Sequence, residues 1–289
     1  SVDYYNTTPM SREGIKQYCT VVNNPENADY FYIGQISCGE AATASPNEFQ
    51  YLADPKYKKK HIVTIEGDWL GSDIPTWLSD CIFTGNGAKL KYTNERFCVR
   101  PCMSRLLVHL AKNDVQYDIQ YPERVSMGFC GQLDPHGTRH KLYTLLHNSN
   151  IMNEFIINSG WCGSVELNNN IIQQYARILR DNLISLCPRG AGEDTIRFYE
   201  SCFFSRVPVI IGNCYVMGED HFDTSFFYRI DPDLSAAELE IKLQQIYKTD
   251  INELIEKAKL ARKYFDEVVK LYYKDPTKYF IEFLKRHNL

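Results

Sequence analysis

The sequence lacks the features that mark membrane and nucleic-acid proteins. No apolar run approaches the roughly 18 residues that a membrane-spanning helix needs, so we expect no span in this chain. The net charge is only -4, and the one basic run, Lys56 to His61, is short enough to be a solvated loop. Because nucleic-acid partners require a concentrated positive surface, we expect none.

Motifs for metals and for the common phosphate loops are also missing. Cys98 and Cys102 form the closest cysteine pair, but no second pair or histidine cluster completes a zinc set. The pattern G-x-x-x-x-G-K-[ST] does not occur, and "GAGEDT" stops short of G-x-G-x-x-G. We expect most of the ten cysteines to be buried free thiols rather than a disulfide framework, because several lie inside apolar runs, namely Cys130, Cys187, Cys202 and Cys214.

The start of the chain gives an expectation about its compartment. It begins at Ser1 without an initiator Met and without the apolar segment of a signal peptide. We expect a cytoplasmic protein. The alternative is the Golgi lumen, if an N-terminal anchor has been removed.

Apolar runs alternate with segments of helical spacing through most of the chain. The first part contains irregular connections around predicted buried strands at 28–34, 61–67 and 80–85. From Arg124 the alternation is more regular, with predicted strands at 124–131, 153–160, 182–187, 207–212 and 225–231 and helices at 137–149, 167–181 and 195–204. Strands that alternate with helices in such short units indicate a parallel sheet covered by helices on both faces.

The end of the chain is helical. Three segments carry an i, i+3, i+4, i+7 apolar stripe and begin with Ser, Asp or Asp-Pro, at 235–249, 250–274 and 275–287. We therefore predict two α/β domains, residues 1–123 and 124–250, and a helical tail, residues 251–289, that packs back toward the first domain. No Gly/Ser-rich linker separates the halves, so we expect them to pack against each other.

The turn "CPRGAGEDT" connects a predicted strand to a helix that begins near Thr195. Ligands of open parallel sheets bind beyond the carboxyl ends of the strands, and a helix N-terminus attracts phosphate. Arg189 lies in the turn, and Arg197 follows Thr195 by two residues. Because a guanidinium binds a diphosphate through two hydrogen bonds, this turn predicts a diphosphate site that needs no phosphate-loop lysine.

Glu200 follows Arg197 by three residues, which places both side chains on one helix face. Two interpretations stay open. The pair forms an intrahelical ion pair, or Glu200 accepts hydrogen bonds from ribose hydroxyls while Arg197 faces the phosphates.

The stretch "YARILRDNLISLCPRGAGEDTIRFYES", with "RVPVII" after it, resembles the signature of the exostosin-like glycosyltransferases, glycosyltransferase family 47. The departures are mild, with Asn182, Ser201 and Val207 in place of the usual Ser, Ala and Ile. Earlier stretches are similar in the same order: "NPENADYFYIG", "KKKHIVTIEGDW" and "SMGFCGQLDPHGTRHKLY". The compact chain is also similar to the short exostosin-like proteins of large algal viruses.

The resemblance implies a GT-B fold, with two Rossmann-like domains facing a cleft and the nucleotide-sugar bound mainly by the second domain. Without the resemblance, Arg139 would more often be interpreted as a surface residue than as part of a donor site. Arginines and a helix N-terminus can stabilise a leaving diphosphate without a metal, so no metal and no other cofactor are expected. By the resemblance the donor site comprises Gly131, Arg139, Pro188, Arg189, Gly190, Thr195, Arg197 and Glu200.

The resemblance also implies inversion of the sugar in one displacement. A base on the first domain must then take the proton of the acceptor hydroxyl. Asp68 is the first candidate, because it follows a predicted strand and matches the family's Asp-Trp, and Asp73 is the second. Asp68 could instead cap a turn or helix. Glu66, Glu40 and His61 also stay open, although His61 could equally begin its strand with a structural hydrogen bond.

The sequence "DPD" at Asp231 to Asp233 fits the letters of the metal-binding Asp-x-Asp of other sugar transferases. It lies between a predicted strand and a helix that begins near Ser235, so a turn is expected instead.

Together with the expected diphosphate site, the resemblance implies an inverting glycosyltransferase. It would move a sugar, with xylose as the first guess, from a UDP-sugar to a hydroxyl of an oligosaccharide or glycoprotein. The alternative is a catalytically silent exostosin-like partner or glycan-binding subunit, against which the presence of Arg189, Arg197 and Glu200 argues. A sulfotransferase would need a phosphate loop after an early strand, and the sequence has none.

Overall fold

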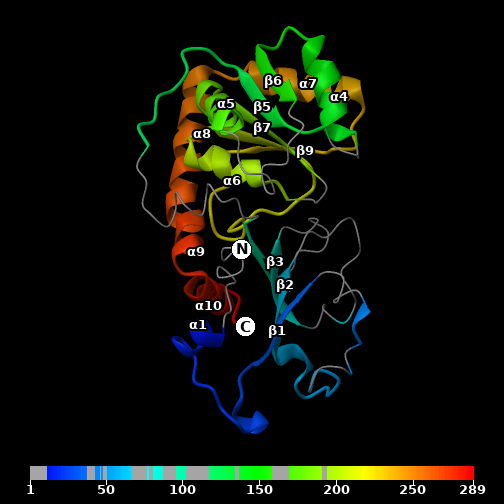
Figure 1. Cartoon of the computed structure of the whole chain (residues 1–289), viewed down its shortest axis with the longest axis vertical. Helices are drawn as coiled ribbons and strands as arrows, with labels where there is room; N and C mark the ends of the chain where they lie inside the picture. The colour runs from blue at the N-terminus through cyan, green and yellow to red at the C-terminus, as the bar shows by residue number, and fades with distance from the viewer. Residues whose placement is uncertain are drawn as a thin grey trace.

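The computed structural model shows two separate parallel β-sheets with helices around them (Figure 1). The structure describes residues 12–37, 43–45, 47, 51–66, 77, 81–86, 96–101, 117–133, 137–157, 169–190 and 194–289. The two sheets have no strand in common. The predicted α/β class is confirmed.

The first sheet has four parallel strands in the order β1-β2-β3-β4. Its strands and the short helical segments around them are β1 Phe31–Ser37, β2 His61–Glu66, β3 Ile82–Asn86, β4 Phe97–Arg100, α1 Arg12–Lys16, η1 Pro25–Asn27 and η3 Lys58–Lys60. The three predicted strands of this part are confirmed. The sequence did not predict β4, which has only four residues, all of them buried.

The basic run before β2 is a loop that ends in η3, as predicted. Lys56 pairs with Glu26, and both side chains are exposed. The Nζ of Lys60 donates to the carbonyl oxygen of Ala28 at 3.2 Å. These lysines therefore contact the loop that precedes β1.

The second sheet has five parallel strands in the order β6-β5-β7-β8-β9. The strands and helices of this half are β5 Met127–Gly131, α4 Thr138–His147, β6 Asn153–Ile157, α5 Asn169–Asp181, β7 Ile184–Pro188, α6 Ile196–Phe203, β8 Val207–Ile211, β9 Tyr228–Ile230 and α7 Ala236–Tyr247. Every strand and helix predicted here is confirmed, with ends that differ by three residues at most.

The chain ends in a helical tail formed by α8 Ile251–Tyr264, the π-helical η6 Phe265–Val269, α9 Lys270–Lys274 and α10 Pro276–Arg286. The predicted caps are present, because the side chains of Asp250 and Asp275 accept hydrogen bonds from the first turns of α8 and α10. The one difference is η6, since a π-helical turn interrupts the single helix predicted over 250–274.

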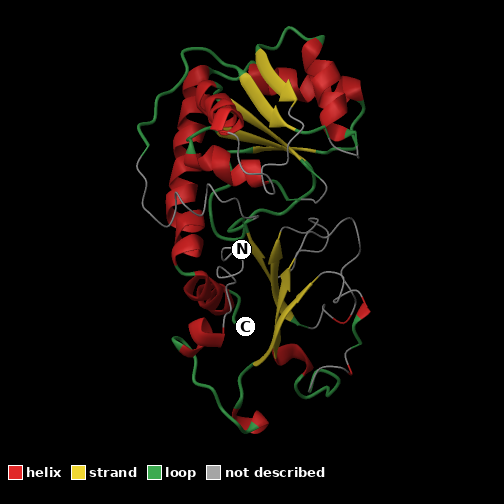
Figure 2. Cartoon of the chain, viewed as in Figure 1, coloured by secondary structure: helices red, strands yellow, loops and turns green. Residues whose placement is uncertain are grey.

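Helices cover both faces of the second sheet (Figure 2). Successive residues of a strand point to opposite faces. Val209 on β8 accordingly belongs to one apolar cluster, with Leu142 of α4 and Leu239 of α7. Its neighbour Ile210 belongs to the other cluster, with Phe198 of α6. Burial on both faces explains why these strands read as continuous apolar runs.

The tail contacts both halves of the molecule. In Figure 1 it runs from beside the second sheet to beside the first, coloured orange to red. Tyr272 and Phe280 of the tail lie in the same apolar cluster as Val63 and Phe83 of the first sheet. The division of the chain at residue 123 stays a prediction.

The described cysteines are free thiols, and six of the seven are buried. This confirms the expectation for Cys130, Cys187, Cys202 and Cys214. Cys98 is also free and buried, whereas Cys102 lies outside the described residues. Within the described parts of the chain, no helix has the length and apolar content that crossing a bilayer requires.

Candidate nucleotide site

The strand order of the second sheet reverses between β5 and β7, the place where open parallel sheets have a crevice at the carboxyl ends of their strands. The chain adds β6 on one side of β5 and then crosses to add β7 on the other side. Connections that leave β5 and β7 therefore go to opposite faces of the sheet, and ligands bind at the carboxyl ends of strands at such a reversal point. β5 ends at Gly131 and β7 ends at Pro188, so Arg189 and Gly190 also lie at this edge.

Arg197, in the first turn of α6, reaches the end of β5. Its Nη2 donates a hydrogen bond to the carbonyl oxygen of Cys130. Its Cζ lies 4.3 Å from the centroid of the Phe129 ring and 5.0 Å from that of the Tyr175 ring. Its Nε and Nη1 are buried, and neither has a hydrogen-bond partner among the described residues. Buried donors without partners are costly, so this geometry indicates a position for an acceptor-rich ligand.

The guanidinium of Arg197 carries a full positive charge at this edge. Burial alone would lower the pKa of Arg197, but its neighbours, led by Tyr175, Cys187 and Glu200, raise the pKa overall. A permanent cation whose Nε and Nη1 bond to none of the described residues matches the charge and the hydrogen-bonding needs of a diphosphate.

Glu200 lies one turn after Arg197 and is only 4% exposed. Its Oε2 accepts a hydrogen bond from the hydroxyl of Tyr175, which comes from α5. Since Arg197 donates instead to the end of β5, the two side chains have different partners. The geometry therefore favours different roles for Arg197 and Glu200 over a simple intrahelical ion pair. The negative charge of Glu200 still contributes to the raised pKa of Arg197.

Arg139, in the first turn of α4, connects the two loops of the crevice. Its Nη1 donates to the carbonyl oxygen of Gln132 at 2.9 Å, and its Nε donates to that of Arg189 at 3.2 Å. A β-carbon on Gly190 would lie 2.9 Å from Nη2 of Arg139. Glycine at position 190 is therefore what lets Arg139 approach the loop after β7.

Gly131 has a similar relation to Arg197. A β-carbon there would lie 3.1 Å from Cζ of the Phe129 ring and 3.4 Å from Nη2 of Arg197. A side chain at this position would press on the groups that hold the guanidinium. The structure thus brings Gly131 and Arg197 together.

Thr195 is the N-cap of α6, as predicted, but its side chain makes no capping hydrogen bond. Its N–H donates to Oδ1 of Asp194 at 2.7 Å, and Asp194 is 8% exposed. This carboxylate already satisfies one donor at the positive end of the helix. An anion at this edge would therefore depend mainly on the arginines.

Most candidates for the catalytic base lie outside the described residues, namely Asp68, Asp73 and Glu40. Glu66 is the last residue of β2 and so lies at the carboxyl edge of the first sheet. These four assignments stay predictions.

His61 has a structural role. It is fully buried at the start of β2, and its Nδ1 lies 2.9 Å from the carbonyl oxygen of Tyr57. Its ring stacks on that of Phe31 with 5.1 Å between centroids. Five residues at about 3.3 Å each place it ~16 Å from the carboxyl end of its strand. The alternative of a structural hydrogen bond is therefore favoured for His61.

The "DPD" sequence forms a turn, as predicted. Oδ1 of Asp231 accepts a hydrogen bond from the N–H of Asp233 at 2.9 Å, and Ser235 caps α7 through a capping box with Glu238. Lys141 of α4 donates to two carbonyl oxygens of the same turn. Elsewhere too, the described residues contain no group of three His, Cys, Asp or Glu side chains placed to hold a metal ion.

Three residues at this edge were not predicted from the sequence. Phe129 was noted only as a letter in a resembling motif, yet its ring lies against Arg197. Tyr175 was likewise only the first letter of the resembling stretch, and its helical spacing gives no sign that its hydroxyl reaches another helix. Asp194 was a letter of the same stretch, and its place before a predicted helix N-terminus was a further signal.

Comparison with known proteins gives one match by sequence. Residues 108–227 match the family model described as the RXYLT1 C-terminal domain. The matched range contains β5 to β8, and so the whole crevice with Arg139, Arg189, Arg197 and Glu200. No curated protein matches the chain significantly.

Solved structures give distant similarities. TarM is 12% identical with a TM-score of 0.36, over 80% of this chain and 55% of TarM, so the chain spans just over half of that protein. A glycosyltransferase from Rickettsia africae ESF-5 is 12% identical with a TM-score of 0.37, over 78% and 77% of the two chains. An alpha1,3-fucosyltransferase is 9% identical with a TM-score of 0.37, over 94% of each chain. The assignment of the fold therefore rests on the two strand orders given above. Two parallel α/β halves with a C-terminal helical tail agree with the GT-B architecture.

Proposed function

We propose that this chain, which resembles the exostosin-like glycosyltransferases and matches the RXYLT1 C-terminal domain over 108–227, is a glycosyltransferase that uses a UDP-sugar. The observation that carries the proposal is Arg197, which has two buried donors at the β5–β7 crevice with no hydrogen-bond partner in the part of the chain that the structure describes. A diphosphate supplies the negative charge and the acceptor oxygens that such a guanidinium requires.

The arginine would act on the leaving group. When the bond between sugar and diphosphate breaks, negative charge develops on the departing oxygen, and fixed cationic donors stabilise it. Arg197 is held in place by Phe129 and by the carbonyl of Cys130, so it needs little rearrangement as the charge develops. Arg189 lies in the adjoining loop and would add a second positive charge.

Glu200 would bind the ribose of the nucleotide. Its carboxylate is buried one helical turn from Arg197 and is oriented by Tyr175. The two hydroxyls of a ribose are neighbours, and one carboxylate can accept a hydrogen bond from each of them. This assignment places the diphosphate beside Arg197 and the nucleoside beside Glu200.

The transfer itself would be an inverting displacement onto an acceptor hydroxyl of an oligosaccharide or glycoprotein. Asp68 is the proposed base and Asp73 the second choice. Xylose is the first donor sugar to test. Glucuronic acid, galactose and arabinose follow, because the exostosin-like family that this chain resembles also uses them.

A thermal-shift screen tests the proposal. Wild type and Glu200→Ala are heated with UDP, GDP, CMP and a panel of UDP-sugars. A ligand at a hundredfold excess over its Kd adds about 2.7 kcal/mol of stability. We expect stabilisation of the wild type by UDP or one UDP-sugar and its loss in the variant. No response to any nucleotide would overturn the proposal. A separate assay of UDP release, with the UDP-sugar that binds and a panel of oligosaccharide acceptors, tests the transfer, and binding without release there would instead support the silent partner.

We also propose that no metal is needed, because Arg189 and Arg197 can neutralise the diphosphate. The affinity for UDP, measured with EDTA and with added Mn²⁺, should then agree within about twofold. A much tighter complex in Mn²⁺ would contradict this part of the proposal.

A further inference from the structure

We infer that Tyr175 is a positioning residue that holds both parts of the nucleotide site, with its ring against Arg197 and its hydroxyl on Glu200. The inference rests on the proposed function and adds to it a residue that determines selectivity for ribonucleotides.

Tyr175 reaches the crevice from a different helix than Arg197 and Glu200 do. It belongs to α5, which packs on β5, whereas Arg197 and Glu200 belong to α6. Its side chain is half-buried. Tyr175 therefore makes a contact between α5 and α6 at the nucleotide site itself.

The ring of Tyr175 limits the freedom of Arg197. The guanidinium lies against two aromatic rings, those of Phe129 and Tyr175, and Nη2 is bonded to the end of β5. A cation against an aromatic ring is stabilised by the negative face of that ring. With three contacts fixed, Nε and Nη1 keep one direction before any ligand arrives, which lowers the entropy lost on binding a diphosphate.

The hydroxyl of Tyr175 fixes Glu200. A carboxylate that is only 4% exposed requires hydrogen bonds, and Tyr175 donates one of them to Oε2. This bond sets the direction in which the carboxylate presents its lone pairs. A ribose is recognised only if that direction suits its hydroxyls, so the phenol controls the discrimination between ribose and deoxyribose.

The two contributions can be separated by substitution. Tyr175→Phe keeps the ring against Arg197 and removes the hydroxyl from Glu200. Tyr175→Leu removes both. Tyr121→Phe is the matched control, because it also deletes a tyrosine hydroxyl bonded to a side chain, that of Ser205 at 2.9 Å, but near the amino end of β8.

The test is calorimetric titration of the four proteins with UDP, 2′-deoxy-UDP and inorganic diphosphate. For Tyr175→Phe we expect about a tenfold loss of UDP affinity, a ratio of UDP to 2′-deoxy-UDP affinity close to one, and diphosphate affinity within about twofold of wild type. For Tyr175→Leu we expect diphosphate affinity to fall as well, by about fivefold or more. Tyr121→Phe should retain the wild-type values for all three ligands.

Three results would overturn the inference. The first is a Tyr175→Phe variant in which the ratio of UDP to 2′-deoxy-UDP affinity remains that of wild type. The second is a Tyr175→Phe variant in which the affinity for all three ligands falls equally. The third is a Tyr175→Leu variant that binds diphosphate as tightly as wild type does. A wild type that binds none of the ligands would overturn the proposed function and the inference with it. Thermal unfolding of each variant, compared with wild type, separates these results from a loss of folding.

Discussion

At the scale of single residues, Gly128 on β5 shows how closely the second sheet packs. A β-carbon at this position would lie 2.9 Å from three side-chain atoms of Asn182. Asn182 is held in turn, because its Nδ2 donates to the carbonyl oxygen of Ile178 at 3.0 Å. The side chain of Asn182 therefore has little freedom to move away.

We predict that Gly128→Ala lowers the free energy of unfolding by about 1–3 kcal/mol, the usual cost of overpacking. Urea denaturation measures the change. Gly85→Ala on β3 is the matched control, since its β-carbon would meet no atom closer than 3.5 Å. Equal losses in the two variants would contradict the packing argument.

The site was predictable in part at this scale. Arg189, Arg197 and Glu200 were found because a glycine-rich turn before a helix is a recognisable local pattern. Tyr175 was not, because its contact with Glu200 joins residues that are 25 positions apart on two helices. No local spacing encodes such a contact, which depends on how α5 and α6 pack on the sheet.

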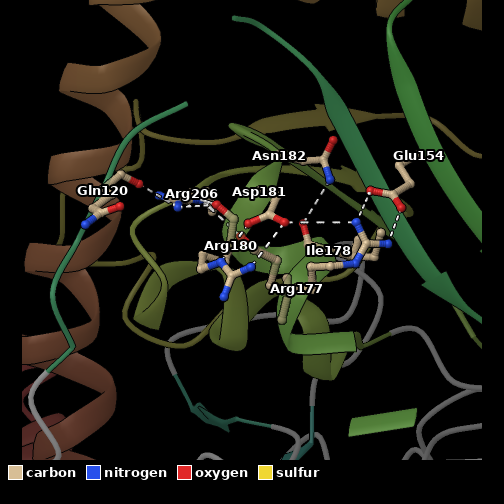
Figure 3. A network of polar contacts seen from close by, with 9 residues as sticks. Gln120, Glu154, Arg177, Ile178, Arg180, Asp181, Asn182 and Arg206 are labelled. Carbon is tan, nitrogen blue, oxygen red and sulfur yellow. Dashed lines mark hydrogen bonds and ion pairs between the residues drawn. The ribbon is translucent and has the colours of Figure 1, made fainter. Parts of the chain in front are cut away.

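At the scale of elements, Arg206 connects the end of α5 to the segment before β5. It is fully buried, and it donates to the carbonyl oxygens of Leu179, Arg180, Ser205 and Gln120. Figure 3 shows Arg206 between Gln120 and Arg180. The last carbonyls of a helix lack partners within the helix and carry partial negative charge, which suits a cation. Burial nonetheless lowers the pKa of Arg206.

Replacement of Arg206 should therefore be severe. Arg206→Met removes the donor from these carbonyl oxygens, among them the buried bonds to Leu179 and Ser205, and we expect a loss of about 3 kcal/mol or more in urea denaturation. Arg177→Met on α5 is the control, because Arg177 pairs with Glu154 while 42% exposed and should contribute about 1 kcal/mol or less. A loss for Arg206→Met no larger than for Arg177→Met would contradict this role.

A second element-level contact joins the loop after β8 to the end of α10. Asp220 lies 2.9 Å from His221, 3.0 Å from His287 and 3.5 Å from Arg286. Burial alone would raise the pKa of Asp220, but the hydrogen bonds and charges of these three partners outweigh it and hold the pKa well below its usual value.

This shift gives a pH dependence with a definite sign. Because the pKa of Asp220 is lower in the folded than in the unfolded protein, its contribution is complete above about pH 4 and is lost as the pH falls further. We expect Asp220→Asn to lower stability at pH 7 by about 1–3 kcal/mol and to lose less than wild type between pH 5 and pH 3. Parallel acid profiles of the two proteins would contradict the assignment.

The elements themselves were largely predictable, for physical reasons that also explain the exceptions. Strands buried on both faces read as apolar runs, and the helices show a clear stripe. β4 was missed because "FCVR" has only four residues and ends in an arginine. The π-helical turn over 265–269 was missed because one inserted residue barely changes the stripe of a long helix.

At the scale of the whole molecule, the two-sheet plan could be predicted because strands and helices alternate along the chain within each half. The way the tail contacts the first sheet depends on distant packing, as shown by the cluster that joins Tyr272 and Phe280 to Val63 and Phe83. That cluster connects the half carrying the nucleotide crevice to the half expected to supply the base.

The measurement that tests the central claim most directly is calorimetric titration of wild type, Arg197→Met and Arg180→Met with UDP. Both variants remove one positive charge, but the side chain of Arg180 is 54% exposed and pairs with Asp181. Because hydrogen bonds to charged groups contribute about 1.5–3 kcal/mol, we predict at least a tenfold rise in Kd for Arg197→Met and little change for Arg180→Met. Equal affinity of all three proteins for UDP would contradict the claim that Arg197 binds the diphosphate.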